Sequence, residues 1–172
     1  TFDDGCKSFY TDVLPLLKEF NYPAVLAIVT SWEEVGPPQG VGAIVSWDQI
    51  REIELSGLVT TASHSHNMHN FVVNNPFGNR GQEGATLLYT PNGYETRDSY
   101  QKRLAGDMEL TQRAFEKNLG HSAEIYVWPY GEYTKLGAEM AQAAGAKVLF
   151  TLGDDVDTKL HRHLGVNRTI IY

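Results

Sequence analysis

The stretch LVTTASHSHNMHN, residues 58–70, places three of the chain's six histidines directly after a segment that predicts a strand. That strand, LVTTA at 58–62, would end where the histidines begin. Neutral imidazole is a good ligand for first-row metals, which makes His64 and His69 candidate metal ligands. The alternative is a polar turn without a metal, which is equally compatible with the turn and cap formers Ser63, Ser65 and Asn67.

The spacing of the histidines predicts the local backbone. His64 and His69 are five positions apart, whereas side chains share one face of a helix when they are three or four apart. This spacing fits the end of a strand followed by a turn. His66 would share the face of His64 only in extended backbone, and it would point elsewhere in a turn.

Helix and strand patterns alternate along the rest of the chain. Apolar residues at helical spacing predict helices over 8–20, 46–57, 96–120 and 135–145. Short apolar runs predict strands over 23–29, 124–128 and 147–151, with a last strand near 165–172. This alternation predicts an α/β fold with a mainly parallel sheet covered by helices. The 172 residues are enough for one domain, 1–172, and do not require a second.

Residues 70–95 interrupt this alternation. They are rich in Gly and Asn and carry the aromatic residues Phe77, Tyr89 and Tyr94. Long loops in compact domains are often functional, so this segment is a candidate wall of a binding groove. An exposed irregular loop is the alternative.

Two further motifs lie at the ends of predicted strands. TFDDG, residues 1–5, offers the paired carboxylates of Asp3 and Asp4, one of which can bind a metal while the other takes a proton. VWPYG, residues 127–131, can aim the backbone N–H of Tyr130 into a cavity. Its aromatic rings also offer flat faces on which a sugar ring can rest. Taken alone, each motif is equally compatible with a surface turn. In parallel α/β sheets, however, the carboxyl ends of the strands gather on one rim, where sites are built.

Composition excludes some classes of function. Fourteen basic and twenty-one acidic residues give a net charge of −7, which argues against binding to nucleic acid. No apolar run approaches the roughly 18 residues that a membrane helix needs. Cys6 is the only cysteine, so no internal disulfide can form. Thr1 is not an initiator Met, and we therefore expect the chain to lack an upstream segment.

TFDDG, HSHNMH and WPYG, in this order, resemble the polysaccharide deacetylases of carbohydrate esterase family 4, the NodB-homology domain. The resemblance spans essentially the whole chain. It is strongest to the branch that N-deacetylates poly-β-1,6-N-acetyl-D-glucosamine, as TTASHSHNMHN (60–70) and YVWPYGEY (126–133) illustrate. It implies a deformed (β/α) barrel, incomplete in this chain, a polysaccharide substrate and an extracytoplasmic location.

The resemblance also implies roles for individual residues. Asp4, His64 and His69 would bind one divalent metal, most simply zinc, with cobalt, nickel or iron as alternatives. Asp3 would be the general base, and the Tyr130 N–H would stabilise the oxyanion. Trp128, Pro129 and Tyr130 would contact the substrate. His66 falls between the matched positions and has no expected ligand role.

The sequence departs from the wider family at two places. The histidine ligands are five rather than four apart, and Val127-Trp128 replaces an Arg before the Pro-Tyr-Gly turn. Both departures match the poly-N-acetylglucosamine branch. That branch is circularly permuted and carries its general-acid His upstream of the TFDDG motif. His161 and His163 are therefore expected to be surface residues.

Other functions remain open on sequence alone. The chain resembles enzymes whose substrates include chitin oligomers, peptidoglycan and xylan, so another acetylated glycan is an alternative. A carbohydrate-binding module with a vestigial site is a second. A phosphatase with an Asp nucleophile is disfavoured for two reasons. Such enzymes use two carboxylates separated by one intervening residue, whereas Asp3 and Asp4 are adjacent, and the histidines would have no role. Oligomeric state is not indicated.

Overall fold

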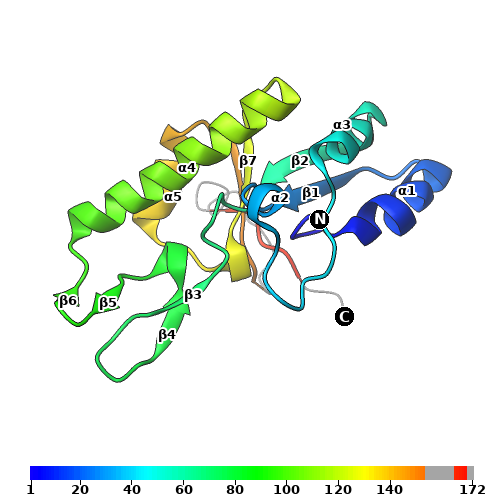
Figure 1. The fold of residues 1–172 in the computed structure, drawn as a ribbon. Coiled ribbons are helices and arrows are strands. Elements are labelled where there is room, and N and C mark those ends of the chain that lie inside the picture. Colours follow the sequence, from blue (N-terminus) through cyan, green and yellow to red (C-terminus); the bar gives the residue numbers. More distant parts are fainter. Residues whose placement is uncertain (154–164, 170–172) are drawn as a thin grey trace.

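The computed structural model of the protein describes residues 1–153 and 165–169. Its centre is a four-stranded parallel sheet in the order β1-β2-β7-β8 (Figure 1). The strands are β1 (Ala24–Ile28), β2 (Val59–Ser63), β7 (Ile125–Val127) and β8 (Val148–Phe150). The predicted α/β fold with a parallel sheet is confirmed.

Helices connect the strands, as the alternating pattern predicts. They are α1 (Leu14–Phe20), α2 (Trp32–Val35), α3 (Trp47–Leu55), α4 (Arg97–Leu119) and α5 (Lys135–Ala143). Figure 1 shows α1 and α3 grouped beside β1 and β2, and α4 and α5 on the side of β7. None of the helices in the described ranges is both long enough and apolar enough to cross a membrane.

Local signals account for where the helices begin and end. Ser46 caps α3 with a full capping box, in which Gln49 reciprocates. Thr96 caps α4, and Gly120 ends it in the left-handed conformation that glycine adopts without strain. The predicted first helix differs in one respect, because residues Phe9–Val13 form a π-helical turn and α1 begins only at Leu14. Pro15 lacks an N–H and is tolerated only in a first turn, which places the α-helical start there.

The hydrophobic core has two main parts on the two halves of the sheet. One lies under α1 and α3 and includes Leu26, Ile53 and Phe115. The other lies between α4, α5 and the strands β7 and β8, and includes Met108 and Trp128. Because α4 contributes to both, it spans the sheet and fixes the two halves relative to each other.

The edges of the sheet extend beyond the four strands and curl toward each other. Phe2 forms a parallel bridge with Leu26 at the β1 edge, and Val166 forms one with Phe150 at the β8 edge. The two bridges extend opposite edges of the sheet. Even so, Asp3, which follows Phe2, accepts hydrogen bonds from Arg168, which lies two residues after Val166. The curvature is that of a sheet bent toward a barrel. Apart from the Val166 bridge, no strand is seen in the described part of the predicted last strand.

The segment 70–95 is more ordered than the sequence indicates. It forms two short antiparallel hairpins, β3 (Phe71–Val73) with β4 (Arg80–Gln82) and β5 (Tyr89–Thr90) with β6 (Gly93–Tyr94), joined by a 3-10 turn at Glu83–Ala85. The interpretation as an irregular loop is therefore wrong. Its strands are two or three residues long, too short for the alternation of polar and apolar residues to be recognised.

One side chain, Arg103 of α4, anchors both hairpins. Its guanidinium donates to both carboxylate oxygens of Glu95, at 3.0 and 2.8 Å. It also donates to the backbone carbonyls of Glu83 and Thr86. The side chains of Arg103 and Glu95 are only 17% and 9% exposed, so the pair is largely shielded from water. The hairpins thus depend on a bidentate ion pair rather than on a core of their own.

Arg103→Ala should destabilise the protein by about 3 kcal/mol, because it leaves the Glu95 carboxylate and two carbonyls without donors in a poorly solvated place. Urea unfolding measures this change. Arg113→Ala on the same helix is the matched control, since Arg113 pairs with Glu109 at a site where both side chains are more than 60% exposed. We expect less than about 0.5 kcal/mol there. Equal losses for the two variants would contradict the anchoring role.

The same ion pair predicts a pH dependence. Burial raises the pKa of Glu95, but hydrogen bonds from Arg103 and the Leu88 N–H outweigh this and hold the pKa below its usual value. A depressed folded-state pKa contributes stability above the unfolded-state pKa, and that stability disappears as the pH falls through the folded-state pKa. The stability gap between wild type and Arg103→Ala should therefore narrow below about pH 4. If the difference in unfolding free energy between wild type and Arg103→Ala instead widens on acidification, the predicted effect of Glu95 is wrong.

Candidate active site

Side chains from two distant segments meet at the carboxyl-end rim of the sheet. The ligand atoms of Asp4, His64 and His69 all lie within 4.8 Å of one another. Asp4 Oδ1 is 3.6 Å from His64 Nε2 and 3.2 Å from His69 Nε2. Asp4 follows the Phe2 bridge and His64 follows β2, so the convergence results from parallel strands that end on one rim.

A left-handed turn brings the carboxylates to this rim. Asp4 and Gly5 have φ values of 71° and 68°. Asp is one of the few residues besides Gly that tolerate this region. A Cβ at position 5 would also lie 3.1 Å from the Ile28 side chain, a tight contact that further favours glycine there. The turn lets the adjacent residues Asp3 and Asp4 face the same cluster, although neighbours in a strand would point apart.

His64 is held in one tautomer. Its ring is 1% exposed, and its Nδ1 lies 2.8 Å from the carbonyl oxygen of Val127, to which Nδ1–H donates. Nε2 then carries a lone pair that faces Asp4. Burial lowers the pKa of His64, so the ring is neutral at neutral pH. An imidazole oriented by a backbone carbonyl is the usual arrangement of a histidine that binds a metal.

His69 is held by aromatic contacts. Its ring meets Trp32 edge to face at 5.2 Å and lies 4.5 Å from the ring of Tyr130. The Tyr130 hydroxyl is 3.2 Å from His69 Nδ1. When Nδ1–H donates to this oxygen, Nε2 keeps its lone pair for the cluster.

The turn between the two histidines is clamped from both sides. The Asp107 carboxylate, on α4, accepts hydrogen bonds from the backbone N–H groups of His66 and Asn67, at 2.9 and 2.7 Å. On the other side, the N–H groups of Thr30 and Ser31 donate to the carbonyls of Ser65 and His66. The clamp fixes the left-handed backbone of Ser65, whose φ is 75°, and thereby the relative position of the two histidines.

The clamp turns His66 away from the cluster. Its Nδ1 is 2.9 Å from the Thr30 hydroxyl, and His66 is not among the residues that could share a metal. Asp107 was missed at the sequence level. The sequence did contain a sign of its role. Asp107 lies three positions after Leu104 and four before Thr111, which places a carboxylate on the otherwise apolar face of the predicted helix 96–120.

Asp4 Oδ1 is buried and has no hydrogen-bond partner among the described residues. A buried carboxylate oxygen without a donor costs free energy, and the nearest nitrogen atoms that face it are Nε2 of His64 and Nε2 of His69. Burial raises the pKa of Asp4, but attraction to the His69 and His64 rings in their protonated forms lowers it overall. One carboxylate and two imidazoles around one point form a donor set that fits a divalent cation, to which each imidazole would bind in its neutral form.

Asp3 lies beside this cluster and is oriented by Arg168. The two guanidinium nitrogens of Arg168 donate to the two oxygens of Asp3, at 2.6 and 3.0 Å. Asp3 Oδ2 is 3.8 Å from His64 Nε2. Arg168 was not identified from the sequence, because it is 165 positions from Asp3 and no local pattern links them.

The expected sugar-stacking role of Trp128 is corrected by the structure. Its ring is 0% exposed and packs against Tyr126 and Tyr133, with Gly137 leaving room for it. Pro129 is also fully buried. Only Tyr130 of this loop presents an exposed ring, at 41%. Its left-handed backbone, with a φ of 58°, turns the ring out of the core toward His69.

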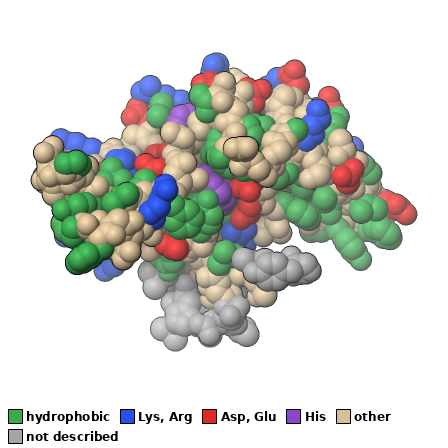
Figure 2. Space-filling view, turned by 60° about the horizontal axis from the view of Figure 1, so that its bottom comes forward, with side chains coloured by type: hydrophobic (Ala, Val, Ile, Leu, Met, Phe, Trp, Pro, Cys, Tyr) green, Lys and Arg blue, Asp and Glu red, His purple; other side chains and the backbone are tan. Residues whose placement is uncertain are grey.

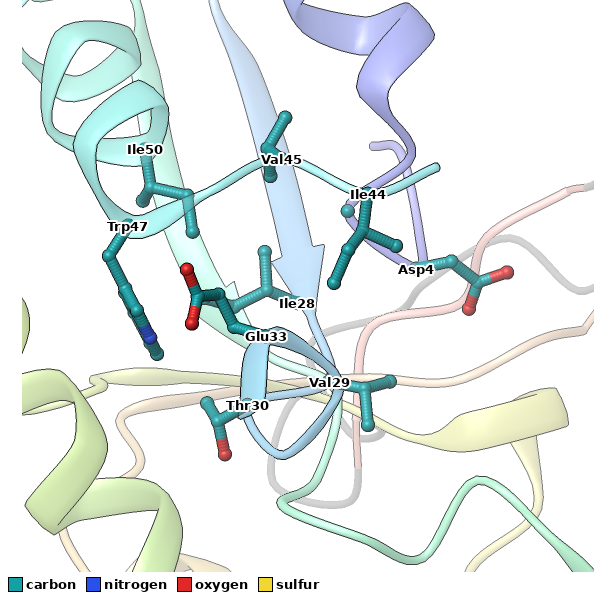
Figure 3. Close-up of a pocket in the computed structure, with 10 residues that line it drawn as sticks. Asp4, Ile28, Val29, Thr30, Glu33, Ile44, Val45, Trp47 and Ile50 are labelled. Atoms are coloured by element: carbon teal, nitrogen blue, oxygen red, sulfur yellow. The ribbon is translucent and has the colours of Figure 1, made fainter. Parts of the chain in front are cut away.

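One face of the protein carries an exposed histidine side chain (Figure 2). Figure 2 shows a histidine side chain near the middle of this face, with acidic side chains on one side and hydrophobic ones on the other. A small apolar pocket behind Asp4 is lined by Ile28, Ile44 and Val45, and the Asp4 carboxylate points away from it (Figure 3). That pocket holds about one water at most and cannot receive a sugar. His161 and His163 lie outside the described residues.

Comparisons with known proteins agree with this geometry. The chain is 32% identical over 163 residues to poly-beta-1,6-N-acetyl-D-glucosamine N-deacetylase of Escherichia coli K12. The matched region covers 88% of this chain and 24% of the relative. It is 24% identical to the enzyme of the same name from Staphylococcus aureus MRSA252, over 99% of this chain and 52% of the relative. The chain thus spans about a quarter and about half of these curated relatives.

Solved structures show the same fold. A de-N-acetylase from Aggregatibacter actinomycetemcomitans superposes with a TM-score of 0.91 at 35% identity, over 99% of this chain and 68% of that one. The BpsB deacetylase domain from Bordetella bronchiseptica gives a TM-score of 0.89 at 34% identity, over 98% and 68%. The sequence profile described as polysaccharide deacetylase matches residues 1–149. With that match over most of its length, the chain belongs to the polysaccharide deacetylase family.

Proposed function

We propose that this chain is the catalytic domain of a metal-dependent hydrolase that removes N-acetyl groups from poly-β-1,6-N-acetyl-D-glucosamine and releases acetate. One observation carries the proposal: the buried Asp4 oxygen has no hydrogen-bond donor among the described residues and faces the Nε2 atoms of His64 and His69. The names of the relatives support the substrate. Because that polymer is a biofilm exopolysaccharide, we place the reaction outside the cytoplasm.

In this proposal Asp4, His64 and His69 hold one divalent cation. Two imidazoles and one carboxylate suit zinc best, and also cobalt, nickel or iron. Such a cation supplies positive charge that polarises the acetamide carbonyl and acidifies water. The hydrogen bond from His64 to Val127 and the clamp by Asp107 keep both imidazoles in position before any ligand arrives.

Asp3 is the general base. Arg168 fixes both of its oxygens, so the carboxylate cannot rotate away from the cluster. A water molecule between Asp3 and the acetamide gives up a proton to Oδ2 as its oxygen attacks the carbonyl carbon. Truncating Arg168 would leave this geometry without support.

Tyr130 borders the reacting group. Its backbone N–H is proposed to donate to the oxyanion of the tetrahedral intermediate, a contact that can contribute about 3 kcal/mol. Burial and the nearby charge of Asp4 raise the pKa of the Tyr130 phenol, so the hydroxyl keeps its proton and can bond to His69. Among the described residues we assign no general acid for the leaving nitrogen.

His64→Ala should lower the bound metal far below one per chain, since it removes one of three ligands. Asp3→Asn should keep the metal but lower kcat for acetate release at least about 100-fold, because the amide cannot accept the proton. Metal analysis after dialysis and acetate release by the full-length protein measure the two effects. His66→Ala, in the same turn but facing Thr30, is the control and should keep its metal. Full metal content in the His64→Ala protein would refute the ligand assignment.

Asp107→Ala should weaken metal affinity about 10- to 100-fold without touching a ligand, because the turn that carries both histidines loses two hydrogen bonds. Competition with a chelating dye measures the affinity. Glu109→Ala, two positions further along α4 and 62% exposed, is the matched control and should bind metal as the wild type does. Equal affinities for Asp107→Ala and wild type would show that the clamp does not position the histidines.

A further inference from the structure

A chain of aromatic contacts leads away from the cluster along the surface. The Tyr130 ring lies 4.5 Å from the His69 ring, and the Phe71 ring lies 4.5 Å from Tyr130 on its other side. Phe71 belongs to β3, the first strand of the hairpins at 70–95. The chain of contacts therefore joins a candidate ligand, the loop after β7 and the hairpin insertion.

The outer two rings of this chain are half exposed. Tyr130 is 41% and Phe71 39% exposed. The two adjoining rings are inclined at 49° to each other and are partly exposed beside the candidate cluster, so each can offer an aromatic face to a ligand.

Phe71 is held in place rather than free to move. Its strand pairs with β4, and Phe71 itself is opposite Gln82. The buried Gln82 amide donates to the carbonyl of Met68, in the histidine turn, at 2.7 Å. Arg80 donates to the carbonyl of Phe71. The position of the Phe71 ring is thus tied directly to the segment that carries His69.

We propose that Phe71 and Tyr130 form a platform that binds a pyranose ring of the polymer next to the residue whose acetamide enters the cluster. This inference rests on the proposed function and deepens it. The axial C–H groups of a sugar ring pack on an aromatic face, and the two rings carry no charge, as suits an uncharged N-acetylated polymer. The platform takes the role that the sequence assigned to Trp128.

The size and position of the platform favour a sugar over a protein partner. Two half-exposed rings offer far less than the roughly 800 Å² per partner of a stable protein interface. Two ring-to-ring steps of 4.5 Å separate Phe71 from His69, a span comparable with one or two linked sugar rings. A ligand on the platform is therefore continuous with one at the cluster, so binding energy gained there can assist the reaction at the neighbouring residue.

The test measures how kcat/KM for acetate release depends on the length of β-1,6-linked N-acetylglucosamine oligomers, from monomer to pentamer, in the full-length protein. Wild type should prefer the pentamer over the monomer. In Phe71→Ala this preference should fall about three- to tenfold, mainly through KM, as the loss of one ring contact implies. Phe71→Trp should keep the preference, since it keeps a ring.

Two further variants separate the aromatic face from other causes. Phe71→Leu keeps an apolar side chain against Tyr130 but has no flat face, and it should lose the preference as Phe71→Ala does. Phe77→Ala is the matched control, because Phe77 is 88% exposed in the turn of the same hairpin. It should keep the wild-type preference.

The outcomes distinguish this inference from the proposed function. Acetate release by wild type with an unchanged length preference in Phe71→Ala overturns the platform and leaves the deacetylase proposal intact. A preference retained in Phe71→Leu also overturns it, because apolar area alone would then suffice. Absence of acetate release from every oligomer by the metal-loaded wild type overturns both.

Discussion

The candidate active site depends on one buried arrangement, in which the Asp4 carboxylate faces the Nε2 atoms of His64 and His69. Alone, this arrangement costs free energy, because Asp4 Oδ1 has no donor among the described residues. The surroundings are built to maintain it. Val127 fixes the tautomer of His64, and Asp107 fixes the turn to His69. A bound cation would offset this free-energy cost by supplying the missing positive charge. Because the site is already arranged, it would not have to rearrange when the cation binds.

The curvature of the sheet brings Asp3 and Arg168 together beside the cluster. Phe2 and Val166 extend opposite edges of the strand order, and a flat sheet would keep residues next to them far apart. Arg168 instead reaches Asp3 with both guanidinium nitrogens. The bidentate pair therefore has two consequences: it orients the Asp3 carboxylate beside the cluster, and it links the two edges of a sheet that is bent toward a barrel. Changes at Arg168 would affect the orientation of the Asp3 carboxylate and the curvature of the sheet together.

Sequence patterns predicted the parts of this structure that depend on local order. Apolar spacing located the four central strands and the long helices, and the end of β2 located His64 and His69. Asp4 was chosen as the third ligand only through the resemblance of TFDDG to a known family. What failed depends on tertiary contacts. Trp128 follows a strand, and only the packing of α5, with Gly137 beneath the ring, decides that its side chain is buried. Arg168 and Asp107 act on partners more than forty positions away, at separations of 165 and 41 residues. A single sequence contains no local signal for such pairs.

The two tasks of the proposed enzyme are carried by separately anchored parts. The cluster stands on the rim of the parallel sheet, where burial and backbone hydrogen bonds hold it. The hairpins that present Phe71 are attached to α4 by Arg103 and to the histidine turn by Gln82. Because the hairpins have little core of their own, their exposed residues can differ without disturbing the packing beneath the cluster. Recognition of the polymer can then change by substitutions in 70–95, while the chemistry remains constrained by the rim.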